Sequence, residues 1–292
     1  MQSKTFLYPV LILWILWALP VQASQPAAQG TRLSASVEYD HGFKAEAKDK
    51  KTELSSSGFR LRADYSYFTL GYEYLHYSWD NPEKTFLTPG SARPWQDLHR
   101  INMAARKNFQ INEKWSFNLG AGMDAAFEQE LDESLGARAD FSVIRNFGRG
   151  WTAGIGAAGF YHPVKSRVFP ALSIRYYPAE LPGFGMNIGF PEASLEYFFH
   201  QAASVKAFAA ISSRTYRLKD KNRVSPEGYF RDQAFKTGIA AKTSLGDSLT
   251  FNVSAYLLVD RKIRIYDHNK SKIMDLRLES SPGAAISLDY TF

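Results

Sequence analysis

Apolar residues recur at every second position along most of the chain. The longest clean run is Trp115, Phe117, Leu119, Ala121, Met123, Ala125 and Phe127, with small or polar residues between its members. Successive side chains of a β-strand point to opposite faces, so this period predicts strands with one apolar and one polar face. Similar runs begin near Leu33, Phe59, Phe68, Ile101, Leu135, Trp151, Val168, Val205, Phe235, Leu249 and Met274, and the last one continues to Phe292.

The connections between these runs alternate between short and long. Short ones such as Asn112-Glu113-Lys114 and Leu245-Gly246-Asp247 carry the residues that tight turns require. Longer, charged connections lie near residues 41–51, 80–95, 218–230 and 266–273. Transmembrane β-barrels combine short turns at one end with longer loops at the other. A soluble β-sandwich produces the same alternation of faces, so the pattern alone leaves both folds open.

The chain begins with a segment typical of a secretory signal peptide. Lys4 precedes an apolar run from Phe6 to Leu19, which is shorter than the roughly 18–20 residues that span a bilayer. Pro20 then breaks the run, and Val21-Gln22-Ala23 supplies small residues at a cleavage site. We predict a signal peptide over residues 1–23, cleaved after Ala23, and a barrel over residues 24–292. An uncleaved N-terminal anchor is the alternative.

The last residues decide between a barrel and a sandwich. Apolar side chains occupy alternate positions from Ala284 to Phe292, and the chain stops on that aromatic residue. This segment resembles the terminal strand of bacterial outer-membrane barrels, in which a final Phe and an aromatic residue two positions earlier form an assembly signal. The resemblance implies that Leu288, Tyr290 and Phe292 are recognised by the barrel-assembly machinery, and that the protein lies in the outer membrane.

We therefore predict an all-β, antiparallel transmembrane barrel of about 12 strands, within a range of roughly 10 to 14. The number of strands that residues 179–202 contribute is left open by the sequence. These residues form either an extended periplasmic connection or two short strands around Pro191, because proline in a strand interior favours a bulge or break. This stretch and the C-terminal third also resemble an uncharacterised family of bacterial barrels, which implies no activity.

Charged residues fall on the face opposite the apolar one. Each would cost about 2–4 kcal/mol in the middle of the membrane, so this face is expected to line the lumen. The acidic residues predicted there include Glu38, Asp64, Asp124, Asp140, Asp275 and Asp289. The predicted pore-lining cations are Arg60, Arg62, Arg100, Arg106, Arg138, Arg175, Lys206, Lys236 and Lys242.

Two functions follow from such a lumen. An excess of cations in a water-filled pore favours anions, so our leading hypothesis is a passive channel for small, preferentially anionic solutes. The alternative is a structural or interaction barrel with a salt-bridged interior, because small barrels are filled by side chains. Neither function involves an enzyme, a cofactor or a metal.

Composition narrows the partners further. The formal net charge is +6, and the chain has no cysteine, so no disulfide holds the fold in an oxidising compartment. We predict that basic loops contact the phosphates of lipopolysaccharide, with a merely solvated loop surface as the alternative. The export signal disfavours nucleic acid as a partner. The basic loop residues are Lys48, Lys50, Lys51, Lys219, Lys221, Arg223, Arg261, Lys262, Arg264, Lys270 and Lys272.

Two motifs and the remaining histidines are candidates for chemistry. The segment Gly154–Gly159 matches the dinucleotide fingerprint, but no helical pattern follows it, so we interpret it as a strand. His76 and Ser78 lie two apart, and the pair resembles that of outer-membrane lipases and lipid A deacylases, which implies a lipid-acting serine esterase as a third hypothesis. Asp80 or Asn81 is the candidate to orient His76. The remaining histidines show no metal-ligand spacing.

Overall fold

The computed structural model describes residues 33–48, 52–82 and 94–292. The predicted signal peptide and its cleavage site after Ala23 lie outside the described residues, so the boundary between residues 1–23 and 24–292 stays a prediction. In the described part of the chain, no helix has the length and apolar character needed to cross a membrane.

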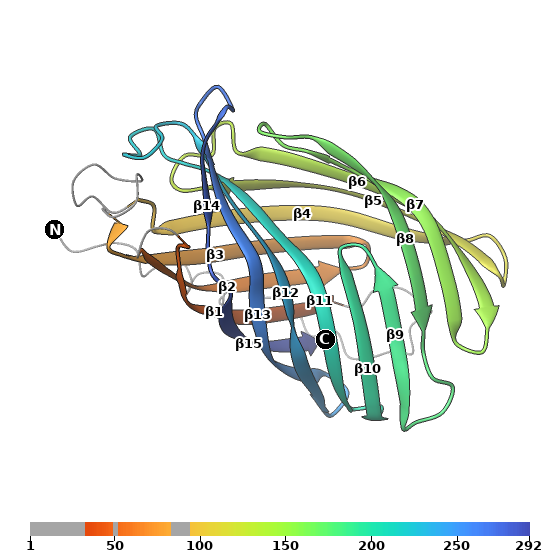
Figure 1. The fold of residues 1–292 in the computed structure, drawn as a ribbon. Helices are drawn as coiled ribbons and strands as arrows, with labels where there is room; N and C mark the ends of the chain where they lie inside the picture. Colours follow the sequence, from red (N-terminus) through yellow and green to blue (C-terminus); the bar gives the residue numbers. More distant parts are fainter. Residues whose placement is uncertain (1–32, 49–51, 83–93) are drawn as a thin grey trace. The chain divides into compact units, whose positions relative to one another are not determined.

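A single antiparallel sheet accounts for the described chain (Figure 1). Except for β14 and β15, which both pair with β13, each strand is hydrogen-bonded to its neighbours along the sequence, as a meander of hairpins requires. The strands are β1 (Leu33–Glu46), β2 (Glu53–Tyr65), β3 (Phe68–Asp80), β4 (Asp97–Gln110), β5 (Trp115–Phe127), β6 (Leu135–Gly148), β7 (Trp151–Tyr161), β8 (Arg167–Tyr176), β9 (Gly183–Gly189), β10 (Glu192–His200), β11 (Ala203–Arg217), β12 (Tyr229–Leu245), β13 (Leu249–Tyr266), β14 (Lys272–Arg277) and β15 (Ser281–Thr291).

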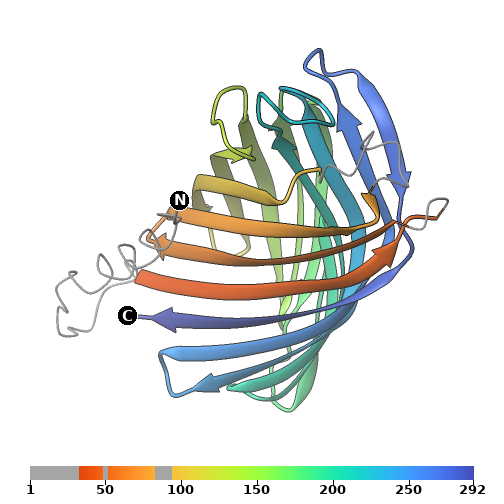
Figure 2. The same cartoon turned by 90° about the vertical axis from the view of Figure 1, so that its left-hand side faces the viewer.

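The sheet closes on itself. The last strand, β15, pairs with β1 along one edge and with β13 along the other, and Figure 2 shows β1 and β15 side by side. β12 also pairs with β13, so no gap remains between the two ends of the strand order. The short strand β14 pairs only with β13, which leaves 14 strands in the closed ring.

The ring therefore has more strands than the estimate of about 12, although 14 lies within the predicted range. The additional strands come from residues 179–202, where β9 and β10 are joined at Phe190-Pro191. The alternative of two short strands around Pro191 is confirmed, and the proline lies in the break between them. The single last run expected from Met274 to Phe292 is instead divided into β14 and β15.

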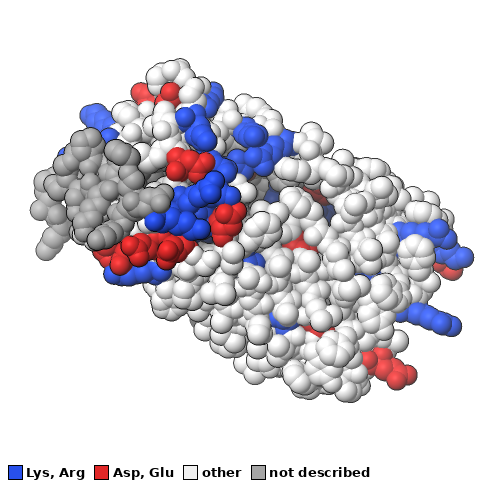
Figure 3. All heavy atoms as spheres, in the orientation of Figure 1, with Lys and Arg blue, Asp and Glu red and all other residues white. Residues whose placement is uncertain are grey.

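The apolar face of the strands points outward. Val168 is 77% exposed, Ile155 64% and Phe68 63%, and many other outward aliphatic and aromatic side chains are exposed as well. A soluble sandwich buries such faces in a shared core, so the sandwich alternative is wrong. The middle of the face seen in Figure 3 carries few charges, and charged side chains gather toward its two ends. This is the surface expected of a lipid-facing barrel.

The two ends of the barrel differ. At one end, which we call the turn end, Leu33 and Phe292 lie with tight turns such as those containing Ser66 and Gly246, both with positive φ. Exposed aromatic residues ring the turn end, as in the interfacial belts of membrane proteins: Tyr65, Tyr67, Trp115, Trp151, Tyr177, Tyr290 and Phe292. At the other end, the loop end, several connections are longer, such as residues 128–134 and 218–228, but β9 and β10 are joined by the turn at Phe190-Pro191.

A dry cluster fills part of the lumen at the loop end. We call it the apolar cluster: Ala45, Ala47, Leu54, Leu75, Tyr77, Trp79, Trp95, Leu98, Ala126, Tyr216, Leu218, Phe230, Ile263, Ile265, Leu276 and Leu278. Trp95 is fully buried, with ring centroids 4.3 Å from Phe230 and 5.2 Å from Trp79. The end of β11 crosses the lumen here, because Arg217 pairs with Phe127 of β5. Opposite walls of the barrel therefore touch.

Bulges turn part of this cluster inward, whereas Leu75, Tyr77 and Trp79 of β3 face the lumen on an unbroken register. The β12–β13 register shifts next to Asp260, whose φ is 49°, and the β1–β2 register shifts between Gly42 and Ala45. One extra residue in a strand exchanges its two faces and sharpens its bend. Beyond Asp260, Arg261 and Ile263 consequently point inward. Our assignment of residues 261–264 to a basic loop was wrong, because they belong to β13.

We expect Trp95→Ala to lower the free energy of unfolding of the detergent-folded barrel by about 3–5 kcal/mol, since it removes the largest side chain of the apolar cluster. The matched control is Trp151→Ala, which removes an exposed ring at the turn end and should cost clearly less. Urea titrations followed by circular dichroism measure both. Equal losses would contradict a dry cluster at the loop end.

Candidate functional site

The nine cations predicted to line a pore all face cavities inside the barrel. A cavity of about 540 Å³ is lined by Arg60, Arg62, Arg100, Arg106 and Arg138. A second, of about 460 Å³, is lined by Lys206, Lys236 and Lys242, and again by Arg60. Arg175 lines a third, of about 320 Å³, close to the turn end. The interior is therefore polar and hollow below the apolar cluster.

Six of these cations form an ion pair with a carboxylate on the same strand, on the next strand or on a strand farther round the barrel. The glycines between them make room for the long side chains; a Cβ at Gly122, for example, would lie 3.0 Å from Nε of Arg138. Asp275 and Asp289 do not meet the nine cations, but accept from Arg264 and Asn252. The pairs are Arg60–Glu38 at 3.0 Å, Arg62–Asp64 at 2.8 Å, Arg100–Asp124 at 3.0 Å, Arg106–Asp140 at 3.0 Å, Lys206–Glu192 at 3.1 Å and Lys236–Asp40 at 2.9 Å.

Three of the nine form no ion pair with a carboxylate of the described residues. Arg175 donates to the amide oxygen of Asn187 at 3.1 Å, while Arg138 and Lys242 have no acidic partner. Arg138 lies between Arg100 and Arg106 in the wall of the largest of these cavities. Cations outnumber acids in the lining of the two larger cavities, although Glu196 beside Lys242 likewise forms no salt bridge among the described residues.

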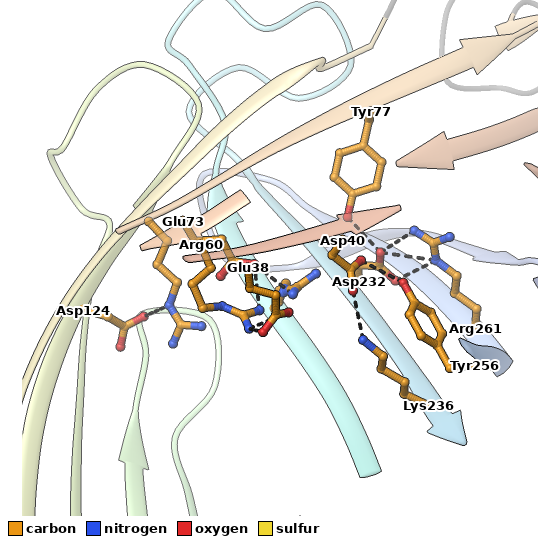
Figure 4. A network of polar contacts seen from close by, with 12 residues as sticks. Glu38, Asp40, Arg60, Glu73, Tyr77, Asp124, Asp232, Lys236, Tyr256 and Arg261 are labelled. Carbon is orange, nitrogen blue, oxygen red and sulfur yellow. Dashed lines mark hydrogen bonds and ion pairs between the residues drawn. The ribbon is translucent and has the colours of Figure 1, made fainter. Parts of the chain in front are cut away.

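A buried carboxylate that sequence reasoning missed joins the two sides of the lumen. Glu73 of β3 accepts from Arg214 of β11 at 2.8 Å and lies 3.6 Å from Arg60 of β2. Its side chain is nearly buried, and Figure 4 shows it beside Arg60 and Glu38. The alternation of Val205, Ala207, Ala209 and Ile211 would have placed Arg214 on the inner face, had we extended it by three residues.

A second buried group lies against the apolar cluster. Asp232 accepts from Arg261 at 2.7 Å and from the hydroxyl of Tyr77 at 2.8 Å. Nearby, Asp40 accepts from Lys236 at 2.9 Å and from the hydroxyl of Tyr256 at 2.8 Å (Figure 4). Strands β1, β3, β12 and β13 are thereby linked across the interior. Arg261 was hidden from sequence analysis because the bulge at Asp260 reverses its face.

His76 and Ser78 point outward from β3, on the face we expected. The acid that orients His76 is Asp97 of β4, whose Oδ1 lies 2.8 Å from Nδ1 of the imidazole. Our candidates were wrong, because Asp80 pairs with Lys44 at 2.6 Å and Asn81 lies beyond the end of the strand. No hydrogen bond joins His76 to Ser78 in the described part of the chain. The segment Gly154–Gly159 lies within β7, so its interpretation as a strand is confirmed.

The other predicted residues lie at the surface. Leu288, Tyr290 and Phe292 are exposed at the outward face of the last strand and its end. Lys48, Lys219, Lys221, Arg223 and Lys270 lie in connections at the loop end, whereas Lys272 begins β14, and Lys50 and Lys51 fall outside the described residues. Within the described ranges, no group of three or more His, Asp or Glu side chains could hold a metal ion.

Solved structures share the barrel fold at low similarity. An outer membrane channel from Pseudomonas putida F1 is 9% identical, with a TM-score of 0.44, and the match covers 93% of this chain and 100% of that one. The Pseudomonas putida toluene transporter TodX is 11% identical, with a TM-score of 0.37 and coverage of 91% and 90%. The KdgM porin in complex with disordered oligogalacturonate is 8% identical, with a TM-score of 0.36 and coverage of 88% and 99%. At these TM-scores the likeness carries no argument about function.

Sequence comparisons give one family. No curated protein matches the chain significantly. A family model described as a domain of unknown function, DUF6268, matches residues 35–291, which is nearly the whole barrel.

We expect Glu73→Gln to lower the free energy of unfolding by about 3 kcal/mol, because it leaves Arg214 in the interior without its closest counter-charge. Glu53→Gln breaks an exposed pair with Lys44 and is the matched control, with a clearly smaller expected loss because solvent screens that pair. Urea unfolding of both variants in detergent makes the comparison. A loss no larger than that of the control would mean that Glu73 does not hold the two walls together.

Proposed function

The chain belongs to the DUF6268 family, a domain of unknown function, and we propose that it is an outer-membrane barrel through which small, preferentially anionic solutes pass passively. The observation that carries this proposal is the excess of cations over acids in the cavity walls, with Arg138 and Lys242 in no salt bridge of the described residues. Cations without acidic partners beside water-filled space attract mobile anions and repel cations.

Location and partners belong to the same proposal. A cleaved signal peptide over residues 1–23 exports the chain, and Leu288, Tyr290 and Phe292 serve the assembly machinery. The outward apolar face contacts outer-membrane lipid. Lys221, Arg223 and Lys270 at the loop end contact lipopolysaccharide phosphates. In this arrangement the turn end faces the periplasm.

A non-conducting barrel is the opposing assignment, and the apolar cluster is the observation that favours it. The side chains of the cluster are buried against one another and close part of the lumen at the loop end. Passage therefore requires a route beside the cluster rather than through it. This limits the proposed channel to small solutes and a low conductance, unlike a wide porin.

A serine esterase acting on lipids is favoured by one contact, the bond between His76 and Asp97. A carboxylate at Nδ1 fixes the imidazole so that Nε2 is free to take the hydroxyl proton of Ser78. The Ser78 oxygen would then attack an ester carbonyl, the proton would pass to the leaving alcohol, and water would hydrolyse the acyl-serine. The three residues lie on the outward face near the loop end, where a lipid ester of the outer leaflet is within reach.

We expect the purified barrel to give discrete current steps in a planar bilayer, with a reversal potential in a KCl gradient that indicates preference for chloride. The double variant R138Q/K242Q should lower the anion preference roughly twofold, because it removes lumen charge without breaking an ion pair. Arg149→Gln changes a cation in a turn outside the lumen and should have no effect. An absence of defined current steps would reject the channel proposal and favour a non-conducting barrel.

The esterase predicts hydrolysis of p-nitrophenyl esters and phospholipids in mixed micelles, with a rate that falls by about a thousandfold or more in Ser78→Ala. Ser55→Ala is the matched control, because Ser55 faces outward directly opposite Ser78 on β2. Activity that survives Ser78→Ala, or no activity in the wild-type protein, eliminates this candidate. Heat-modified electrophoretic mobility confirms that each variant is folded.

A further inference from the structure

The barrel wall is low between β8 and β11. β9 and β10 are the two shortest strands of the closed ring, and Figure 1 shows their hairpin ending well below the neighbouring strands. β8 pairs with β9 only from Ser173 to Tyr176, and β10 reaches β11 only as far as Ala210. Above the turn at Phe190-Pro191, the edges of β8 and β11 therefore face each other without a strand between them.

A cleft of about 370 Å³ opens at this low wall. Phe160 and Phe169 line it from the inner face of β7–β8, and Phe190 with Pro191 forms its floor. The rings of Phe169 and Phe190 stack with centroids 5.3 Å apart. The opposite side is the outer face of β11–β12, with Arg231 among its residues, because the inward bend of β11 turns that face toward β7–β8.

Cations in the cleft far outnumber acids. The only carboxylate among its lining residues is Asp124, which is paired with Arg100. Arg231 donates to the hydroxyl of Ser213 at 3.0 Å and faces the charge of Arg167. Neither of these arginines has an acidic partner among the described residues. The cations that line the cleft are Arg100, Arg138, Lys165, Arg167, Arg214 and Arg231.

The histidine of the cleft adds a donor rather than a charge. Nδ1 of His162 accepts from the backbone N–H of Val164 at 3.2 Å, which places the proton of the neutral ring on Nε2. Burial lowers the pKa of His162 to about 4, so the ring is neutral at pH 7. Its Nε2 has no acceptor in the described part of the chain. The positive potential of the cleft thus comes from its arginines and from Lys165.

The cleft is continuous with the charged lumen. Arg100, Asp124, Arg138 and Arg214 line both the cleft and the cavity of about 540 Å³ below it. The apolar cluster closes the direct route along the barrel axis on the β1–β4 side. A solute that moves between the lumen and the loop end can therefore pass at the side, past these shared arginines.

We propose that this cleft binds a small anionic amphiphile, an organic acid with an aromatic or aliphatic body, and that it is the lateral mouth of the lumen. The proposal rests on the function proposed above and names the class of solute. The phenylalanine floor receives the apolar body, and Arg167 and Arg231 receive the carboxylate. A volume of about 370 Å³ fits a small molecule and excludes a lipid with several acyl chains. Charge complementarity also excludes neutral hydrocarbons as the preferred occupant.

Equilibrium binding tests the cleft without relying on current. Saturation-transfer NMR measures binding of 4-phenylbutyrate to the full barrel in nanodiscs, with 4-phenylbutan-1-ol as the uncharged counterpart. The acid should bind at least about tenfold more tightly than the alcohol, and R167Q/R231Q should remove that difference. Arg264→Gln is the matched control, because Arg264 lies opposite Arg231 on β13 but pairs with Asp275. Equal binding of acid and alcohol overturns the proposal.

A thiol reporter gives a second measurement that does not depend on the arginine variants. The natural chain has no cysteine, so Ser213→Cys places a single thiol in the cleft wall. Saturating 4-phenylbutyrate should slow its reaction with a charged maleimide several-fold and leave Ser244→Cys, on the inner face of β12 near the turn end, unchanged. Unaltered labelling at position 213, or protection by stoichiometric lipopolysaccharide instead of the acid, refutes the assignment.

The two proposals can fail separately. Anion-selective current steps together with acid binding that is insensitive to R167Q/R231Q would reject the cleft and keep the channel. Arginine-dependent binding of the acid without any current would reject the channel as a conduit and keep the cleft as a binding site.

Discussion

The hydrocarbon around this barrel imposes the constraint from which the rest follows. Backbone groups cannot remain unpaired in lipid, so the sheet must close, and the pairing of β15 with β1 and β13 achieves this. The same surroundings push charge to the inside. Glu73 and Arg214 are tolerated because they pair across the lumen, and Asp232 and Arg261 because they pair between adjacent strands on its inner side.

Closure alone does not give this interior. The bulge at Asp260 and the register shift after Gly42 reverse the faces of β13 and β1 near the loop end. Apolar side chains of β1 and β13 then join those of β3 and β11 in the lumen, where β11 reaches across to β5. The apolar cluster and the cleft share one cause, the inward bend of β11. The end of β11 contacts β5 across the lumen and therefore does not lie beside β8 in the barrel wall.

The candidate site was predictable in part. All nine cations assigned to the inner face do line cavities there, because strict alternation holds along the lower part of every strand. The same alternation predicts that Arg214 faces inward. It does not predict this for Arg261, since a single bulged residue reverses the face of everything that follows it. Asp97 could not be predicted as the partner of His76, because cross-strand neighbours depend on register, which sequence spacing does not reveal.

By itself, the sequence determined the class of the fold. Period-two apolarity, tight turns that alternate with long loops, and an aromatic last strand sufficed, because the membrane selects locally for alternating faces. Only the tertiary structure decided the number of strands, the closing of the loop end and the position of the cleft. These depend on registers and bulges, which are set by contacts between strands far apart in the chain and leave no periodic trace in the sequence.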